Sequence, residues 1–93
     1  MWYVYIVQCN DGSFYTGIST DLEQRIKDHN DGRASEYTKD RIPVALLYCE
    51  DFQSKSEARM REVEIKKYGV RNKVKLIKRG LGRRFISTAI SEN

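Results

Sequence analysis

Residues 2–19 read WYVYIVQCNDGSFYTGIS, and the topology of the chain follows from this segment. Its two halves are rich in aromatic and β-branched residues, which favours strands over residues 2–8 and 13–18. Asn10, Asp11 and Gly12 lie between them and suit a three-residue hairpin loop, a type I turn with glycine in the left-handed bulge position. The chain is therefore predicted to begin with an antiparallel hairpin.

The length of this loop sets the register of the hairpin, and the register decides which side chains share a face. A three-residue loop pairs Val7 with Tyr15 and Tyr5 with Gly17, so that both tyrosines lie on one face. A two-residue Asp-Gly turn places Tyr5 and Tyr15 on opposite faces instead. We expect the longer loop.

Two capping boxes mark the starts of two helices. Thr20 with Glu23 opens the first helix, which we expect to end near residue 32. Ser54 with Glu57 opens the second helix, which we expect to reach about residue 68 with Gly69 as its C′ residue.

The remaining elements are a polar loop over residues 33–42, a third strand over 44–49 and a short final helix over 72–79. The predicted fold class is α/β, of the α+β kind: a small three-stranded sheet with helices packed on it, in the order β-β-α-β-α-α. Residues 1–79 form one domain, and residues 80–93 are expected to be a flexible, basic and polar tail.

The composition excludes several classes of protein. The longest apolar runs have six residues, whereas a membrane-spanning helix needs about 20. We therefore expect no membrane association, and no basic segment precedes the first run as in a signal peptide.

Two cysteines and one histidine cannot build a Cys/His zinc site. We expect both cysteines to be reduced packing residues in a cytoplasmic protein.

The basic residues are concentrated near the end of the chain. Residues 66–84 hold nine of the 17 basic residues and no acid. This segment either faces phosphate groups or is a solvated basic helix and tail, and charge alone does not decide between the two. If it faces phosphates, the candidate contacts are Lys66, Lys67, Arg71, Lys73, Lys75, Lys78 and Arg79.

Five residues are candidates for chemistry: Tyr5, Tyr15, Arg25, His29 and Glu62. Each one alone has an ordinary explanation, since strand tyrosines are usually core and helical arginines, histidines and glutamates are usually solvated. Their spacing is more specific. Arg25 and His29 lie one helical turn apart, and Glu62 falls on the apolar face of its helix, an unusual place for a carboxylate.

Taken together, the tripeptides YVY at 3–5 and YTG at 15–17, followed by Arg25, His29 and Glu62, resemble the GIY-YIG nuclease family. The segments YTGISTDLEQRIKDHNDG and SEARMREVEIKKY are similar to the family's motifs, and the resemblance runs from Trp2 to about Ile77. Tyr3 replaces the leading glycine of the first tripeptide. The chain looks most like the stand-alone, single-domain bacterial branch of the family.

The resemblance implies a metal-dependent DNA endonuclease with one Mg²⁺ or Mn²⁺ ion. Glu62 would hold the ion, since hard cations prefer oxygen ligands. Arg25 would clamp the phosphate with its planar donors, and Tyr15 would orient water or phosphate. Gly17 would leave the sheet face open to the nucleic-acid backbone.

Tyr5 is the general base that the resemblance implies. With a pKa of about 10, a free tyrosine is ionised in roughly one molecule in a thousand at pH 7, so it needs a neighbouring cation. Arg25 and the metal ion are the candidates for that cation. His29, with an intrinsic pKa of about 6.5, is the alternative base or a proton relay.

A chain of this size leaves little surface for reading bases. We therefore expect DNA cleavage that is structure-selective or weakly sequence-specific, or directed by a protein partner, in DNA repair or recombination. The alternative is a non-catalytic nucleic-acid-binding module with the same fold. All five site positions carry the family's residue types, which favours cleavage.

Overall fold

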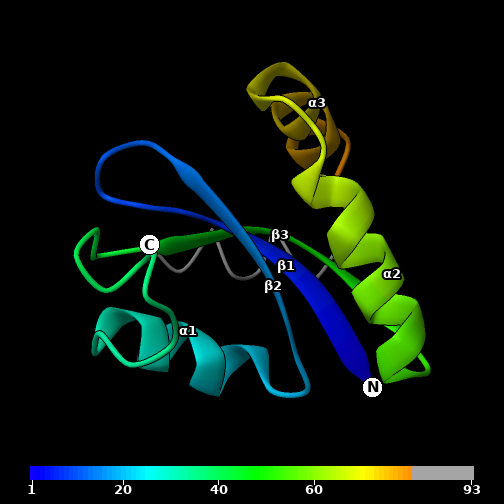
Figure 1. Cartoon of the computed structure of the whole chain (residues 1–93), viewed down its shortest axis with the longest axis horizontal. Coiled ribbons are helices and arrows are strands. Elements are labelled where there is room, and N and C mark those ends of the chain that lie inside the picture. The colour runs from blue at the N-terminus through cyan, green and yellow to red at the C-terminus, as the bar shows by residue number, and fades with distance from the viewer. Residues whose placement is uncertain (81–93) are drawn as a thin grey trace.

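The computed structural model describes residues 1–80, and the chain follows the predicted order β-β-α-β-α-α (Figure 1). The strands are β1 (Trp2–Gln8), β2 (Phe14–Ser19) and β3 (Ala45–Phe52), and the helices are α1 (Leu22–Asn30), α2 (Lys55–Lys66) and α3 (Val70–Gly80). The predicted tail lies outside the described residues except for Gly80, which ends α3.

The hairpin has the register that a three-residue loop predicts. Tyr5 pairs with Gly17 and Val7 with Tyr15. The Gly12 N–H donates to the Cys9 carbonyl at 2.9 Å, and Gly12 takes the left-handed conformation with φ of 87°. The prediction that Tyr5 and Tyr15 share a face is confirmed.

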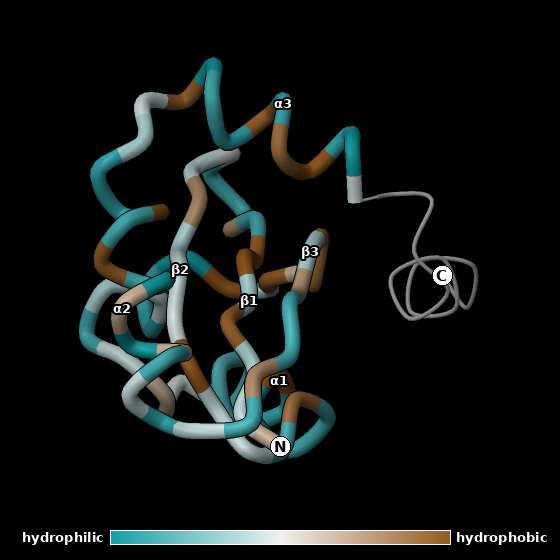
Figure 2. Tube along the Cα trace, turned by 90° about the vertical axis from the view of Figure 1, so that its right-hand side faces the viewer, coloured by the Kyte–Doolittle hydropathy of each residue, from teal (hydrophilic) through white to brown (hydrophobic). Residues whose placement is uncertain are grey.

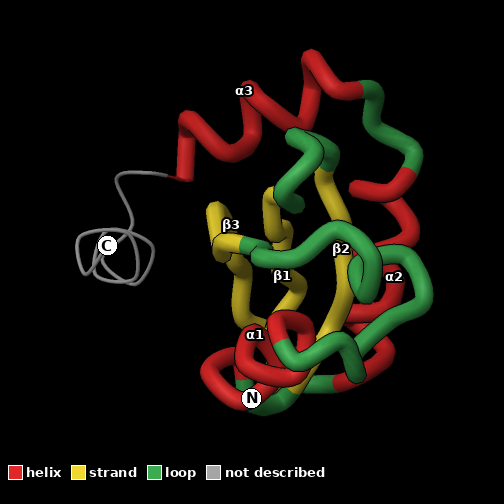
Figure 3. The backbone as a smooth tube through the Cα atoms, turned by 90° about the vertical axis from the view of Figure 1, so that its left-hand side faces the viewer, coloured by secondary structure: helices red, strands yellow, loops and turns green. Residues whose placement is uncertain are grey.

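The sheet is antiparallel, with strand order β2-β1-β3, so β1 is the central strand. Helix α1 lies on one side of the strands, and α2 and α3 lie on the other (Figures 1 and 3). Because paired residues point the same way and side chains alternate along a strand, Tyr5, Gly17 and Cys49 face α1. The opposite face carries Tyr48 and Glu50 toward the other two helices.

Three local predictions need correction. Helix α1 is capped by Asp21 rather than Thr20, since the Asp21 carboxylate accepts the Gln24 N–H at 3.1 Å. A charged oxygen suits the positive end of the helix dipole. Gly69 has no left-handed conformation, and its carbonyl instead accepts the Lys73 N–H at the start of α3. Strand β3 continues to Phe52, beyond the predicted end at residue 49.

The capping box of α2 is confirmed, because Ser54 accepts the Glu57 N–H while Glu57 accepts the Ser54 N–H. Helix α2 ends at Lys66, slightly earlier than predicted. It packs against all three strands and is tied to β3 by Arg61, which donates two hydrogen bonds of 2.9 Å to Glu50.

Helix α3 is amphipathic, with hydrophobic and hydrophilic residues alternating along its trace (Figure 2). Leu76 and Ile77 are buried, as predicted, while Val74 is half-buried. The helix approaches β3 so closely that a Cβ on Gly80 would clash with ring carbons of Tyr48. A side chain at this position is therefore incompatible with the docking of α3.

Both cysteines are buried packing residues, and burial raises the pKa of the Cys9 thiol. Within residues 1–80, no helix combines the length and the apolar character that crossing a membrane requires.

Candidate active site

The five candidate residues come from four elements. Tyr5 lies on β1, Tyr15 on β2, Arg25 and His29 on α1, and Glu62 on α2. The hairpin register brings the two tyrosines to the face that α1 covers, and the one-turn spacing of α1 turns both of its residues toward them. Four of the five residues are thus brought together by the hairpin and the helix that follows it.

Tyr5, Tyr15 and His29 form a compact aromatic cluster. The Tyr5 hydroxyl is hydrogen-bonded to His29 Nε2 at 2.8 Å. The Tyr15 ring centroid lies 5.3 Å from that of His29 and 6.5 Å from that of Tyr5. The edge-on arrangement of the Tyr15 and His29 rings, with planes 68° apart, is one that aromatic pairs prefer.

Gly17 makes room for Tyr5. A Cβ at Gly17 would lie 2.6 Å from the Tyr5 hydroxyl and 2.8 Å from the ring carbon that carries it. The space above the glycine is therefore filled by a side chain of the same protein. This corrects the expectation that Gly17 leaves the sheet face open to a nucleic-acid backbone.

The pKa of Tyr5 is shifted upward, against the expectation that neighbouring positive charge favours its ionised form. Burial raises the pKa of Tyr5 above its usual range, and the neighbouring Tyr15 adds to the shift. Arg25 opposes this increase through its charge and a hydrogen bond to the hydroxyl, while the Glu62 carboxylate raises the Tyr5 pKa further. Arg25 alone does not make Tyr5 a stronger acid than free tyrosine.

His29 is held by hydrogen bonds at both ring nitrogens. Nε2 contacts the Tyr5 hydroxyl and Nδ1 contacts the Thr38 hydroxyl, each at 2.8 Å. Burial lowers the pKa of His29, and the charge of Arg25 lowers it further, against a smaller opposing effect of Asp28. The imidazole is therefore neutral at pH 7.

Acid should destabilise the protein through His29. In the unfolded chain the imidazole has a pKa of about 6.5, whereas in the folded protein the pKa is lower. The unfolded state then binds more protons below about pH 6.5, so the free energy of unfolding falls as the pH decreases. Denaturant unfolding at pH 7.5 and pH 5 should show a smaller loss for His29→Gln than for the wild type. Equal losses would contradict the argument.

Glu62 lies on the buried side of α2, between Ala58 and Ile65, as the sequence spacing predicts. Its side chain is 14% exposed, and its carboxylate pairs with Lys66 at 3.1 Å. The Lys66 ammonium also lies 5.9 Å from the centroid of the Tyr15 ring. Glu62 and Lys66 thus connect α2 to the aromatic cluster.

The residues around Glu62 limit which metal ion could bind there. No group of three or more His, Cys, Asp or Glu side chains occurs within residues 1–80 in an arrangement that could hold a metal. A single carboxylate beside tyrosine hydroxyls fits only a hard cation that keeps most of its water, as Mg²⁺ does. Lys66 occupies the carboxylate in this structure, so a cation would compete with the ammonium group.

The cluster is less accessible than expected for a site open to solvent. Tyr5 is 1% exposed and His29 is 0% exposed. Tyr15, Arg25 and Glu62 are half-buried and form the part of the cluster that reaches the surface.

Three residues of the loop between α1 and β3 join the cluster and were not predicted. The Tyr37 ring stacks on Tyr15, with centroids 6.1 Å apart and planes at 19°. The Arg41 guanidinium lies 4.1 Å from the Tyr37 centroid, and Thr38 binds His29. An exposed aromatic in an otherwise polar loop was the one signal in the sequence for this contribution.

The basic segment begins at the cluster and continues along α3. Lys66 borders Tyr15. Burial lowers the pKa of Lys73, and the charge of Lys66 lowers it further. The other predicted contacts are exposed on the connection that follows α2 and on α3; they are Lys67, Arg71, Lys75, Lys78 and Arg79.

The profile of the GIY-YIG catalytic domain matches residues 1–75, which cover the sheet, α1, α2 and the first half of α3. The chain therefore belongs to the GIY-YIG family, a family of nucleases.

Its relatives are bacterial single-domain proteins. A UPF0213 protein of Staphylococcus saprophyticus is 54% identical over 78 residues, which are 84% of this chain and 95% of that protein. A UPF0213 protein of Staphylococcus haemolyticus is 55% identical over 75 residues, 81% of this chain and 92% of that protein.

Two solution NMR structures are similar to the fold. The UPF0213 protein BH0048 from Bacillus halodurans is 42% identical with a TM-score of 0.58, and the match covers 95% of this chain and 94% of that one. Protein EF2693 from E. faecalis is 37% identical with a TM-score of 0.56, covering 82% and 81% of the two chains.

Proposed function

We propose that this protein is a metal-dependent endonuclease that hydrolyses phosphodiester bonds in DNA. The observation that carries the proposal is the convergence of Tyr5, Tyr15 and His29 with Arg25 and Glu62 beside them. Phosphodiester hydrolysis needs an activated water, positive charge at the phosphate and help for the leaving oxygen. This group of side chains contains a candidate for each requirement.

Arg25 and Tyr15 are the proposed contacts to the phosphate, because both are half-exposed at the edge of the cluster. The Arg25 guanidinium offers a planar set of donors that matches phosphate oxygens. Tyr5 lies behind them, bonded to His29, and is the proposed acceptor of the proton from the attacking water. Its burial requires Tyr15 to yield when the substrate enters.

Glu62 is the proposed ligand of one Mg²⁺ or Mn²⁺ ion. A cation bound there would add positive charge beside the phosphate and the leaving oxygen. The Lys66 ammonium lies beside Tyr15 while it is paired with Glu62, so a cation that displaced it from the carboxylate would leave it available to a phosphate.

Cleavage assays test the proposal directly. Labelled single-stranded, duplex and branched DNA, with RNA in parallel, should be incubated with Mg²⁺, Mn²⁺ or a chelator. We expect cation-dependent cleavage of at least one DNA form and none with the chelator. Intact substrates under all conditions, with binding retained, would favour the alternative function below.

The alternative is a nucleic-acid-binding module without catalysis. The observation in its favour is that Tyr5 and His29 are buried while Glu62 is neutralised by Lys66. Under this alternative, the affinity for DNA should not depend on Arg25 or Tyr15 and should come from the basic segment alone.

The basic segment is the proposed backbone-binding surface, and this can be tested by its salt dependence. Contacts to phosphates release counterions, so log K falls with log salt by about 0.9 per phosphate contacted on duplex DNA. Alanine at the exposed Lys75, Lys78 and Arg79 should weaken binding to all sequences alike and flatten that slope by about 2 to 3.

The matched control carries alanine at three exposed basic residues elsewhere, Lys27, Lys55 and Arg59, which removes the same charge. Equal effects of the two triple variants would mean that net charge, and not the α3 surface, controls binding.

We further propose a setting for this activity. Phosphate contacts carry no sequence information, so cleavage is structure-selective or weakly sequence-specific, or is directed by a protein partner. DNA repair or recombination in the cytoplasm is the proposed context.

A further inference from the structure

A series of hydrogen bonds leads from Tyr5 through His29 and Thr38 to Ser35, in the loop between α1 and β3. The Tyr5 hydroxyl binds His29 Nε2 at 2.8 Å, and His29 Nδ1 binds Thr38 Oγ1 at 2.8 Å. Thr38 Oγ1 in turn binds Ser35 Oγ at 3.0 Å. His29 and Thr38 are completely buried, so the inner links are shielded from water.

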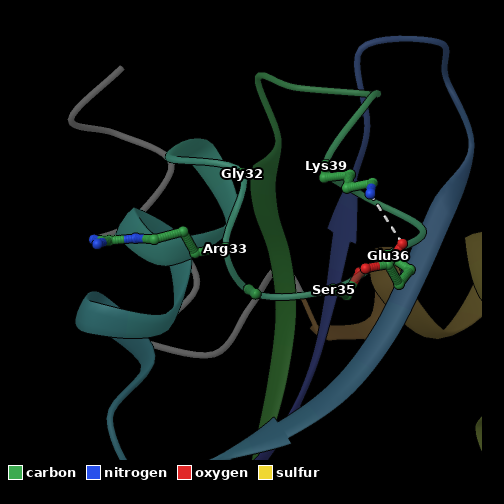
Figure 4. Close-up of a pocket in the computed structure, with 6 residues that line it drawn as sticks. Gly32, Arg33, Ser35, Glu36 and Lys39 are labelled. Carbon is green, nitrogen blue, oxygen red and sulfur yellow. Dashed lines mark ion pairs between the residues drawn. The ribbon is translucent and has the colours of Figure 1, made fainter.

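The outer end of this series of hydrogen bonds, at Ser35, reaches solvent. Ser35 is half-buried and lines a surface hollow of about 290 Å³ together with Gly32, Arg33, Ala34, Glu36 and Lys39. Figure 4 shows Ser35 beside the ion pair of Glu36 and Lys39, whose charged atoms lie 3.0 Å apart. A proton that reaches Ser35 can therefore pass to water in this hollow.

One assignment of donors and acceptors runs consistently along these hydrogen bonds. In this assignment the Tyr5 O–H donates to His29 Nε2. A neutral imidazole with Nε2 as acceptor carries its hydrogen on Nδ1, which donates to Thr38. The Thr38 hydroxyl then donates to Ser35, whose oxygen also accepts the Thr38 backbone N–H. Every donor points outward, from Tyr5 toward the hollow.

We infer that Thr38 and Ser35 are positioning residues that hold His29 in the Nδ1–H tautomer and carry a proton from Tyr5 to the surface hollow. The inference rests on the proposed endonuclease function. Thr38 and Ser35 would thus act together with the five candidate residues of the site.

The transfer conserves protons and charge at each link. As water attacks phosphorus, its proton moves to the Tyr5 oxygen while the Tyr5 O–H breaks and a bond forms between that hydrogen and His29 Nε2. The Nδ1 proton passes to Thr38, the Thr38 proton passes to Ser35, and the Ser35 proton passes to water in the hollow. After the products leave, the reverse sequence delivers a proton from the hollow to solvent in the site and restores the first tautomer.

This route removes a difficulty for Tyr5 as a base. Because burial raises the pKa of Tyr5, a free tyrosinate would be rare at neutral pH. In the concerted route the tyrosine stays neutral, since it loses one proton as it gains another. The nearby ionisable groups are Tyr15, Arg25, Asp28 and Glu62, and the positive charge of Arg25 disfavours an imidazolium that would retain the proton.

The experiment uses His29 as its own reporter, because it is the one histidine in the chain. Nitrogen-15 NMR of the imidazole at neutral pH should show the Nδ1–H tautomer in the wild type and in Thr38→Ser. Thr38→Val has nearly the same shape and no hydroxyl, and it should shift the imidazole toward the Nε2–H tautomer.

Cleavage kinetics provide the second measurement. Thr38→Val should lower kcat by about 100-fold with little change in KM, at the lower end of the range of proton-transfer catalysis, and Thr38→Ser should restore most of it. The matched control is Thr16→Val, since Thr16 is a buried threonine whose hydroxyl has no hydrogen-bond partner within residues 1–80. That control should change neither the tautomer nor kcat.

An Nε2–H tautomer in the wild type would overturn the inference, and so would an unchanged kcat in Thr38→Val. A Thr38→Ser variant as slow as Thr38→Val would also overturn it. A wild-type protein that cleaves no substrate would refute the proposed function and the proton transfer with it. The tautomer assignment would still be decided by the NMR spectrum.

Discussion

Glu62→Gln should nearly abolish cleavage while the protein still binds DNA. Glutamine keeps the shape and helix propensity of the side chain but removes the charge that would hold a cation beside the phosphate. Lewis-acid stabilisation contributes several kcal/mol, so a loss on the order of 10³-fold in rate is expected. DNA affinity should survive, because the proposed phosphate contacts come from Arg25 and the basic segment.

The fold should tolerate this substitution. The partner of Glu62 is Lys66, half of whose side chain is exposed, whereas the structural ion pair of α2 joins Arg61 to Glu50. Cleavage rate, DNA affinity and thermal midpoint should be measured together, with Glu64→Gln on the exposed side of the same helix as the control. Unchanged cleavage would exclude Glu62 from the reaction, and a collapsed midpoint would make it a structural residue.

Gly17→Ala should impair both the site and the stability of the protein. The new Cβ would lie 2.6 Å from the Tyr5 hydroxyl, and Tyr5 is almost completely buried. Either the tyrosine ring shifts and its hydrogen bond to His29 is lost, or the hairpin strands separate. Overpacking of this kind costs about 1 to 3 kcal/mol, and a displacement of about 1 Å at a catalytic group can lower the rate by about 10²-fold.

The control for this prediction is Gly69→Ala, where an added Cβ has no atom within 4 Å and the backbone is not left-handed. Thermal unfolding and cleavage should be compared for the two variants. Cleavage by Gly17→Ala at the wild-type rate would show that the position of the Tyr5 hydroxyl is not important for the reaction.

The strand register and the helix faces that position the site residues could be predicted from the sequence, because both depend on local geometry. The three residues Asn10 to Gly12 fix the pairing of β1 with β2, and helical periodicity places Arg25 and His29 on one side of α1. The same periodicity places Glu62 on the buried face of α2. In each case the relevant distance along the chain is short, so the backbone geometry decides the outcome.

The parts that could not be predicted depend on contacts between distant segments. The loop between α1 and β3 has no hydrophobic periodicity; Tyr37 stands out as an aromatic residue among polar ones, but its partner Tyr15 and the bond from Thr38 to His29 cannot be read from the sequence. The fully buried His29 is bound by Thr38 of that loop as well. At the start of α1, Thr20 and Asp21 are both good N-cap residues, and sequence alone did not distinguish them.

The position of the sheet between α1 and α3 also has an evolutionary consequence. The aromatic cluster lies on the α1 side, while α3, which carries exposed lysines and arginines, lies on the other side. Substitutions at well-separated positions have nearly additive effects. Natural selection can therefore adjust how strongly the protein holds a nucleic acid by exchanging surface residues on α3, without disturbing the residues that hold Tyr5 in place. A lineage could gain a new substrate preference in this way while it keeps the hairpin and α1 unchanged.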